Sequence, residues 1–258
     1  MGKRIFALSV AICMALSGCS KDSPDFADVP PPEELYARGL EELQGRNILG
    51  LYTWVNYTKA IETFQTIIDN YPYSDYEVEA QLKIADAYFD SSSYDEALSY
   101  YRDFSDLHPQ NPKVPHTILR SALCYYEQIR SIDRDQTSTR EALKYLEALS
   151  SRYPYDAATR EGEIILQSLR TRLASNTMEI GDFYLKRTQY QSAASRYRTV
   201  LDEYPGLGSD AEALFKLGLC YQHMKRVDEA LRLYYVVLEN FGGSRYAEQA
   251  AEQIAGTE

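Results

Sequence analysis

Three histidines and two of the four cysteines are the side chains of this chain best suited to metal or nucleophilic chemistry. His108, His116 and His223 are far apart, and none has a cysteine or carboxylate at the spacing of a metal site. Cys124 and Cys220 lie in separate segments and are expected to be core residues rather than a disulfide. No nucleophile elbow or phosphate-binding glycine loop is present. The sequence therefore predicts no catalytic residue, no metal site and no cofactor.

Cys19 offers a different chemistry, the acylation of its thiol. Lys3 and Arg4 precede an apolar run over residues 5–16, which is too short to span a bilayer and has the layout of a secretory signal. The run ends in Leu16-Ser17-Gly18-Cys19, which resembles the bacterial lipobox. The resemblance implies that residues 1–18 are removed and that Cys19 receives a diacylglyceryl group and an N-acyl chain. By the same resemblance, Ser20 at the second position of the mature chain implies that the protein is anchored in the outer membrane and faces the periplasm.

The charge of the chain is strongly acidic. The whole sequence has 27 basic and 38 acidic residues, a formal net charge of −11. Residues 1–18 contain two of the basic and none of the acidic residues, so the remainder has 25 against 38, a net charge of −13. Such a balance disfavours nucleic acid as a partner. The 45% apolar content is enough for a buried core.

The chain beyond its N-terminal segment is built from a repeated sequence pattern. Residues 19–32 are polar and contain Pro24 and Pro30-Pro31-Pro32, so they are expected to form an extended, lipidated tether rather than a helix. Beyond Glu33, an alanine is followed five times, after twelve residues, by a helix-stopping residue. A large apolar residue comes four positions after each alanine, on the same helix face. The pairs are Ala60 and Pro72, Ala97 and Pro109, Ala142 and Pro154, Ala193 and Pro205, and Ala230 and Gly242.

A partner helix precedes each of these helices. In three repeats it contains a small residue three positions before a tyrosine, namely Ala85 before Tyr88, Gly181 before Tyr184 and Gly218 before Tyr221. Small residues allow two helices to approach closely, and this is the tetratricopeptide pattern. The sequence therefore predicts an all-α, superhelical solenoid of about five tetratricopeptide-type helical hairpins.

Three departures from regular spacing indicate insertions, which are expected in loops or at helix ends. The first enlarges the loop of the first repeat and includes Trp54, and the second is the charged loop 130–135. In the third, apolar residues keep helical spacing between Pro154 and Thr177, which predicts four extra turns on the first helix of repeat four. We expect repeats 1–3 over residues 33–155, and the long helix with repeats 4 and 5 over residues 156–258. The long helix would brace the two halves.

One stretch differs in charge from the rest of the chain. Residues 160–198 contain seven basic and four acidic side chains. Arginine is suited to bidentate pairing with carboxylates, so this basic segment is a candidate surface for an acidic partner. Internal ion pairing is the alternative explanation.

The chain resembles the BamD family, lipoproteins of the outer-membrane β-barrel assembly machinery. The resemblance rests on the lipobox, the five repeats and the segments EIGDFYLKR (179–187) and YQSAASRY (190–197). The resemblance implies a non-catalytic protein that binds the barrel insertase BamA through its periplasmic POTRA domain, together with other lipoproteins of the complex. It implies that the C-terminal repeats face BamA, with the family's arginine at Arg196 and with Arg187 and Arg198 nearby. Thr177 departs from the glutamate usual in that family.

The same resemblance implies that the N-terminal repeats receive unfolded outer-membrane protein precursors, with a groove around Tyr36, Phe64 and Tyr88. An alternative remains open at this point. A tetratricopeptide lipoprotein that coordinates peptidoglycan synthesis or cell division would have the same anchor and repeats but would lack the long inserted helix.

Overall fold

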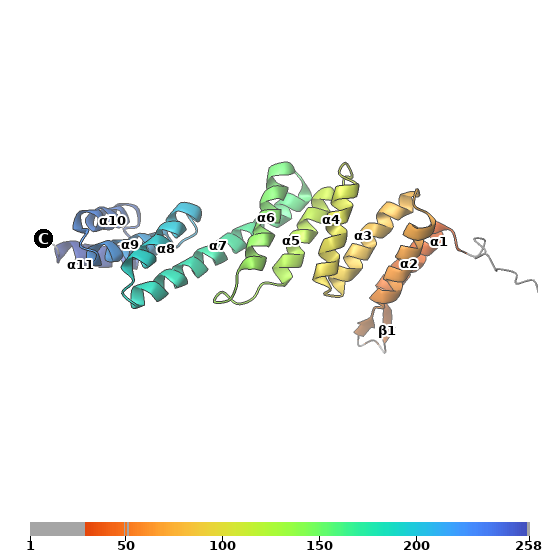
Figure 1. The fold of residues 1–258 in the computed structure, drawn as a ribbon, viewed down its shortest axis with the longest axis horizontal. Helices are drawn as coiled ribbons and strands as arrows, with labels where there is room; N and C mark the ends of the chain where they lie inside the picture. The colour runs from red at the N-terminus through yellow and green to blue at the C-terminus, as the bar shows by residue number, and fades with distance from the viewer. Residues whose placement is uncertain (1–28, 49, 51, 257–258) are drawn as a thin grey trace, which may run out of the picture.

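The protein is an elongated array of antiparallel helices that pack mainly on their neighbours in the chain (Figure 1). The computed structural model describes residues 29–48, 50 and 52–256, so Cys19 and the expected tether as far as residue 28 lie outside the described residues. Five hairpins follow one another, and a final helix covers the last hairpin, which confirms the predicted all-α repeat fold. The helices are α1 (Pro32–Gln44), α2 (Tyr57–Asn70), α3 (Asp75–Asp90), α4 (Tyr94–Leu107), α5 (Val114–Glu127), α6 (Thr137–Arg152), α7 (Ala157–Lys186), α8 (Tyr190–Glu203), α9 (Asp210–His223), α10 (Val227–Asn240) and α11 (Arg245–Ala255).

Three of the hairpins are closed by a glycine opposite a large ring. Gly181 on α7 faces Tyr197 on α8, and a Cβ atom added at Gly181 would lie 2.6 Å from the ring. Gly39 and Gly218 stand in the same relation to Phe64 and Tyr234. All three rings are almost fully buried. The small residues therefore set the close approach of the paired helices, as their spacing predicts.

Local signals at the helix ends explain where the chain reverses. The second helix of every hairpin ends at a C-cap one residue before the predicted stop. These C-caps are Tyr71, His108, Tyr153, Tyr204 and Phe241. The following helix often begins at a side-chain cap. Ser74 accepts a hydrogen bond from the backbone N–H of Glu77, and Asp156 accepts one from Ala158.

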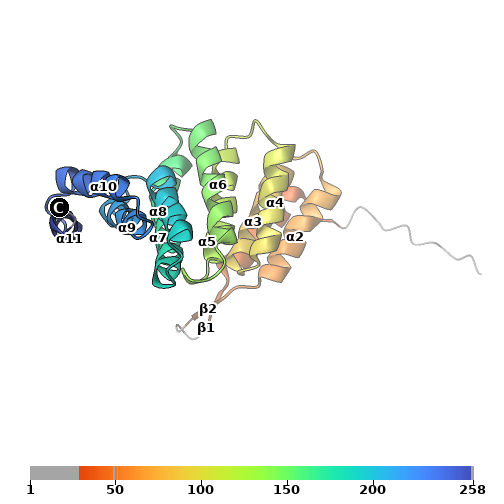
Figure 2. The ribbon, with the colours of Figure 1, turned by 60° about the vertical axis from the view of Figure 1, so that its left-hand side comes forward.

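The enlarged loop of the first repeat is a small β-hairpin and not an irregular loop. Its strands are β1 (Arg46–Ile48) and β2 (Tyr52–Trp54), paired antiparallel with Arg46 opposite Trp54. Gly45 permits it, because it has a φ of +71° and a Cβ there would lie 2.6 Å from the carbonyl oxygen of Trp54. The hairpin projects from the edge of the array where α1 connects to α2 (Figures 1 and 2).

The long helix α7 joins two packed cores. Its first half contributes Leu166 and Leu169 to a core shared with α3–α6, and its second half contributes Ala174 and Met178 to a core shared with α8–α11. Its 30 residues confirm the predicted helical insertion and correspond to about 45 Å. The helix thus braces the two halves, as expected. Within the described part of the chain, no helix is long and apolar enough to cross a membrane.

The charged loop 130–135 is held against this helix. The buried side-chain amide of Gln136 donates to the carbonyl oxygens of Ser131, Ile132 and Arg134 at 2.9–3.2 Å. Asn176 on α7 donates to the carbonyl oxygen of Ile132 at 2.7 Å. Two amides therefore satisfy the backbone of a loop whose charged side chains face solvent.

Candidate interaction surfaces

The groups with possible chemistry lie apart from one another. His108 accepts or donates one hydrogen bond with Gln81 at 2.9 Å, and His223 stacks on Tyr190 with ring centroids 4.4 Å apart. Over the described residues, no group of three or more His, Cys, Asp or Glu side chains is arranged to hold a metal ion. Cys124 and Cys220 are buried free thiols, and burial raises the pKa of each to about 12. Such thiols stay protonated and unreactive at neutral pH.

Two polar networks join successive repeats and have the same sequence spacing. Tyr197 on α8 donates its hydroxyl hydrogen to Asp182 on α7 at 2.6 Å, and Lys216 on α9 donates to the same carboxylate at 2.6 and 2.7 Å. The equivalent tyrosine of repeat two donates to an aspartate on α3 at 2.8 Å and accepts from an arginine on α5 at 3.0 Å. The members of that network are Asp86, Tyr101 and Arg120.

These networks connect three helices each, the two of one hairpin and the first of the next. In both, the tyrosine follows the aspartate by 15 residues and the cation follows the tyrosine by 19. Burial is the first cause that raises the pKa of Tyr197, and its hydrogen bond to Asp182 raises it further. Burial alone would lower the pKa of Lys216, but its hydrogen bonds to Asp182 and Glu212 raise it overall. The charged network therefore fixes the packing of adjacent repeats. The repeated spacing of 15 and 19 residues is the sequence signal by which these networks could be found.

The three arginines predicted to face a partner do not form one cluster. Arg187 follows the end of α7 and stacks its guanidinium group on the ring of Phe183, 3.8 Å from the centroid. Arg198 on α8 donates to the hydroxyl of Tyr221 on α9. Arg196 is exposed and, among the residues that the structure describes, has no hydrogen-bond or ion-pair partner. Residues two apart on a helix do not share a face, so Arg196 and Arg198 point in different directions.

The basic segment is spread along α7 and does not form a single surface. Arg160 and Arg187 are 27 residues apart, which is about 40 Å along a helix. Arg170 pairs with Glu147 at 2.8 Å, and Arg172 donates to the side chain of Gln136 at 3.2 Å. The alternative of internal pairing therefore applies to the middle of the segment. Among the described residues of the segment, Arg196 on α8 and Lys186 at the end of α7 are exposed and have no hydrogen-bond or ion-pair partner.

The predicted N-terminal groove needs a correction. Phe64 has no exposed surface, because its ring fills the space opposite Gly39, so it does not line a groove. Tyr36 is half-buried against Phe64 and Tyr76, with ring centroids 5.6 and 5.4 Å away. Tyr88 is half-buried and stacks on a different tyrosine of α4. Tyr76 and Tyr88 are twelve residues apart on α3, about 18 Å, so Tyr36 and Tyr88 do not form one compact site.

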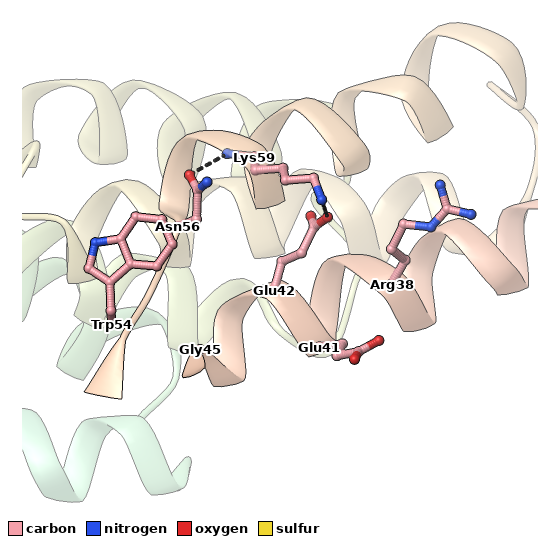
Figure 3. A pocket seen from close by; sticks show the side chains of 7 residues that line it. All are labelled: Arg38, Glu41, Glu42, Gly45, Trp54, Asn56 and Lys59. Atoms are coloured by element: carbon pink, nitrogen blue, oxygen red, sulfur yellow. Dashed lines mark hydrogen bonds and ion pairs between the residues drawn. The ribbon is translucent and has the colours of Figure 1, made fainter. Parts of the chain in front are cut away.

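A pocket of about 380 Å³ lies beside the β-hairpin, between the end of α1 and the start of α2 (Figure 3). Half of the Trp54 side chain is exposed at its rim. Glu42 is mostly buried, accepts a hydrogen bond from Thr63 at 2.9 Å and forms an ion pair with Lys59 at 3.0 Å. The pocket is lined by Arg38, Glu41, Glu42, Gly45, Trp54, Asn56 and Lys59. Two acidic and two basic side chains beside an indole suit a mixed peptide segment better than a singly charged ligand.

A second pocket, of about 390 Å³, lies among α4, α5 and α6. Val114 and Ile118 belong to its apolar part, and Arg102 and Arg152 are exposed at it. Neither pocket has a sequence signal, since each is formed by residues from two or three different helices.

The arrangement defines a class of protein before any comparison. A series of helical hairpins with exposed, unpaired cations and mixed pockets, and with both thiols of the described residues buried, is a tetratricopeptide-type repeat array.

Comparison with known proteins then identifies the family. The model of the YfiO family, described as outer membrane lipoprotein, matches residues 29–233. The chain belongs to this family. Two curated relatives are called outer membrane protein assembly factor BamD. The one from Caulobacter vibrioides is 29% identical over 94% of this chain and 75% of its own length, and the one from Rickettsia prowazekii is 28% identical over 96% and 95%. A solved structure of the TPR2AB domain of yeast Sti1 with pHSP90 is 15% identical, with a TM-score of 0.43 over 87% of this chain and 83% of that one.

Proposed function

We propose that this chain is a non-catalytic scaffold of outer-membrane protein assembly that binds the periplasmic POTRA domain of BamA through its C-terminal repeats. The observation on which this rests is Arg196, an exposed cation on α8 with no hydrogen-bond or ion-pair partner among the described residues, in a chain whose curated relatives are called assembly factors. An unpaired guanidinium group can bind a partner's carboxylate without first breaking an internal bond.

The proposal includes the place of the protein in the cell. Cys19 would carry the acyl chains and hold the array at the periplasmic side of the outer membrane. The family match over residues 29–233 supports this location, because the family is described as outer membrane lipoprotein. The curated relatives are called outer membrane protein assembly factor BamD, and this favours assembly over a role in peptidoglycan synthesis or cell division.

The N-terminal repeats would receive unfolded precursors. Tyr36 and Tyr88 remain candidates, and the pocket beside Trp54 is added to them, because it combines an exposed indole with charges of both signs. Such a lining suits extended polypeptide of varied sequence, which presents backbone amides and apolar side chains together.

Binding of purified chain variants to the periplasmic region of BamA from the same bacterium tests the first part. We expect Arg196→Glu to weaken binding at least about tenfold, which corresponds to about 1.4 kcal/mol. The matched control is Arg140→Glu, the same charge reversal at an exposed position on α6, the second helix of repeat three. Full binding by the Arg196 variant, or equal losses in both variants, would contradict the proposed contact.

A further inference from the structure

The exposed apolar side chains of this protein are concentrated at one kind of position. Four large apolar side chains in the described part of the chain are more than 60% exposed, and three of them lie at the connections between successive hairpins. Tyr73 is 100% exposed between α2 and α3, Leu107 is 66% exposed where α4 ends, and Tyr155 is 92% exposed between α6 and α7. Single exposed apolar residues are ordinary, but three at equivalent turns of three successive repeats form a pattern.

These three turns lie along the same edge of the array. Because the helices alternate in direction, every second connection returns to the same side, and Figures 1 and 2 show the α2–α3, α4–α5 and α6–α7 connections together, opposite the β-hairpin. We call residues 71–75, 107–113 and 152–156 the turn edge. Successive turns are two helices apart, about 20 Å. The turn edge therefore presents a row of apolar side chains and not one compact patch.

The N-terminal segment enters the fold at this edge. The hydroxyl of Tyr71, two residues before Tyr73, donates to the carbonyl oxygens of Val29 and Pro30 at 3.1 and 3.0 Å. Val29 also packs against the core of the first repeat. Ten residues separate Cys19 from Val29, and they span at most about 35 Å. A membrane anchor on Cys19 would thus be attached within about 35 Å of the point where the chain enters the fold, next to the first of the three exposed turns.

The charge of the turn edge differs from that of the whole chain. It contains two acidic residues, Asp75 and Asp156, and two basic residues, Lys113 and Arg152. It is neutral in a chain with a net charge of −11. A membrane with anionic lipids repels an acidic surface, and the turn edge carries no net negative charge that would oppose its approach to one.

We propose that the turn edge of repeats 1–3 lies on the membrane surface, with Tyr73 and Tyr155 at the level of the lipid headgroups and Leu107 between them. Tyrosine suits this position, because its ring is apolar while its hydroxyl stays hydrated. The inference deepens the proposed function, since it relies on the anchor being at Cys19. It assigns the array an orientation, with the β-hairpin and the Trp54 pocket directed away from the bilayer.

The test measures the depth of an indole at each edge. Trp54 is the single tryptophan and lies on β2, in the β-hairpin at the opposite edge, so it is the natural control. In a Trp54→Phe background, Tyr73→Trp and Tyr155→Trp each place one indole on the turn edge. Both tyrosines are exposed, so the fold should be retained, and circular dichroism checks this. Residues 20–258 with an N-terminal histidine tag are held on phosphatidylcholine vesicles containing nickel-chelating and some anionic lipid, which makes the measurement independent of acylation.

We expect brominated lipids to quench both introduced indoles and to shift their emission to the blue, while native Trp54 keeps its emission in water. No quenching at positions 73 and 155, or equal quenching at all three positions, would overturn the inference. Acylation of Cys19 is measured separately, by mass spectrometry of the mature protein from envelopes. An unmodified Cys19 would refute the anchor of the proposed function, whereas an unquenched turn edge on tethered protein would refute only the orientation.

Discussion

Removing one hydroxyl from the repeat junction should have a measurable cost in stability. Tyr197 is fully buried, and its hydroxyl donates a hydrogen bond to Asp182, which also accepts one from Lys216. Tyr197→Phe keeps the ring opposite Gly181 and deletes only this hydrogen bond. A hydrogen bond to a charged group contributes about 1.5–3 kcal/mol. Asp182 retains Lys216 and is one-third exposed to water, so we expect the lower end, about 1.5 kcal/mol.

Thermal unfolding followed by circular dichroism at neutral pH measures this change. For a chain of this length, about 1.5 kcal/mol corresponds to a decrease in Tm of about 3–6 °C. The matched control is Tyr234→Phe in the next repeat. Tyr234 is equally buried, but its hydroxyl donates to the neutral side chain of Gln222 at 2.9 Å, so the expected loss is about 1 kcal/mol or less.

The dependence on pH provides a second measurement on the same variant. The pKa of Tyr197 is raised, so the folded protein keeps this phenol neutral at a pH where the unfolded chain ionises it. The stability from this group is therefore complete below about pH 10 and falls as the pH rises above it, by up to about 1.4 kcal/mol per pH unit. Tyr197→Phe should lose less stability over this range than the parent. Equal neutral-pH losses for the Tyr197 and Tyr234 variants, together with an unchanged alkaline slope, would refute the role assigned to the charged network.

Two further predictions concern the core. Gly181→Ala should destabilise the protein by about 1–2 kcal/mol, because its Cβ would lie 2.6 Å from the Tyr197 ring and this overpacking exceeds the gain in helix propensity. Denaturant unfolding measures the change in stability. Unchanged stability would show that the two helices can move apart. Cys124 and Cys220 are both fully buried, with pKa values of about 12. In folded protein that begins at Ser20, both thiols should resist iodoacetamide at pH 8, and they should react in denaturant. Rapid labelling of either thiol in the folded protein would contradict the packing.

Several predicted contacts failed for a common reason. The distance of Phe64 from Ala60 identifies it correctly as a large residue on the packed face, but a groove lining requires exposure, and its ring is enclosed opposite Gly39. The basic residues of 160–198 are close in sequence, yet the length of α7 separates Arg160 from Arg187 by about 40 Å. The loop around Trp54 has no marked strand pattern, and its three-residue strands are too short to show one.

The helices, their pairing into hairpins and the long α7 can be predicted from the amino-acid sequence, because a repeat fold is built from contacts between neighbouring segments whose spacing is regular. Which cations are free, which rings are enclosed and which turns share an edge depends on how separate helices pack. Arg170 and Arg196 are the same residue type in the sequence. Arg170 has a carboxylate of the preceding helix 2.8 Å away, whereas Arg196 has none among the described residues. Such differences arise because side chains of separate helices come into contact, and a local sequence pattern does not predict these contacts.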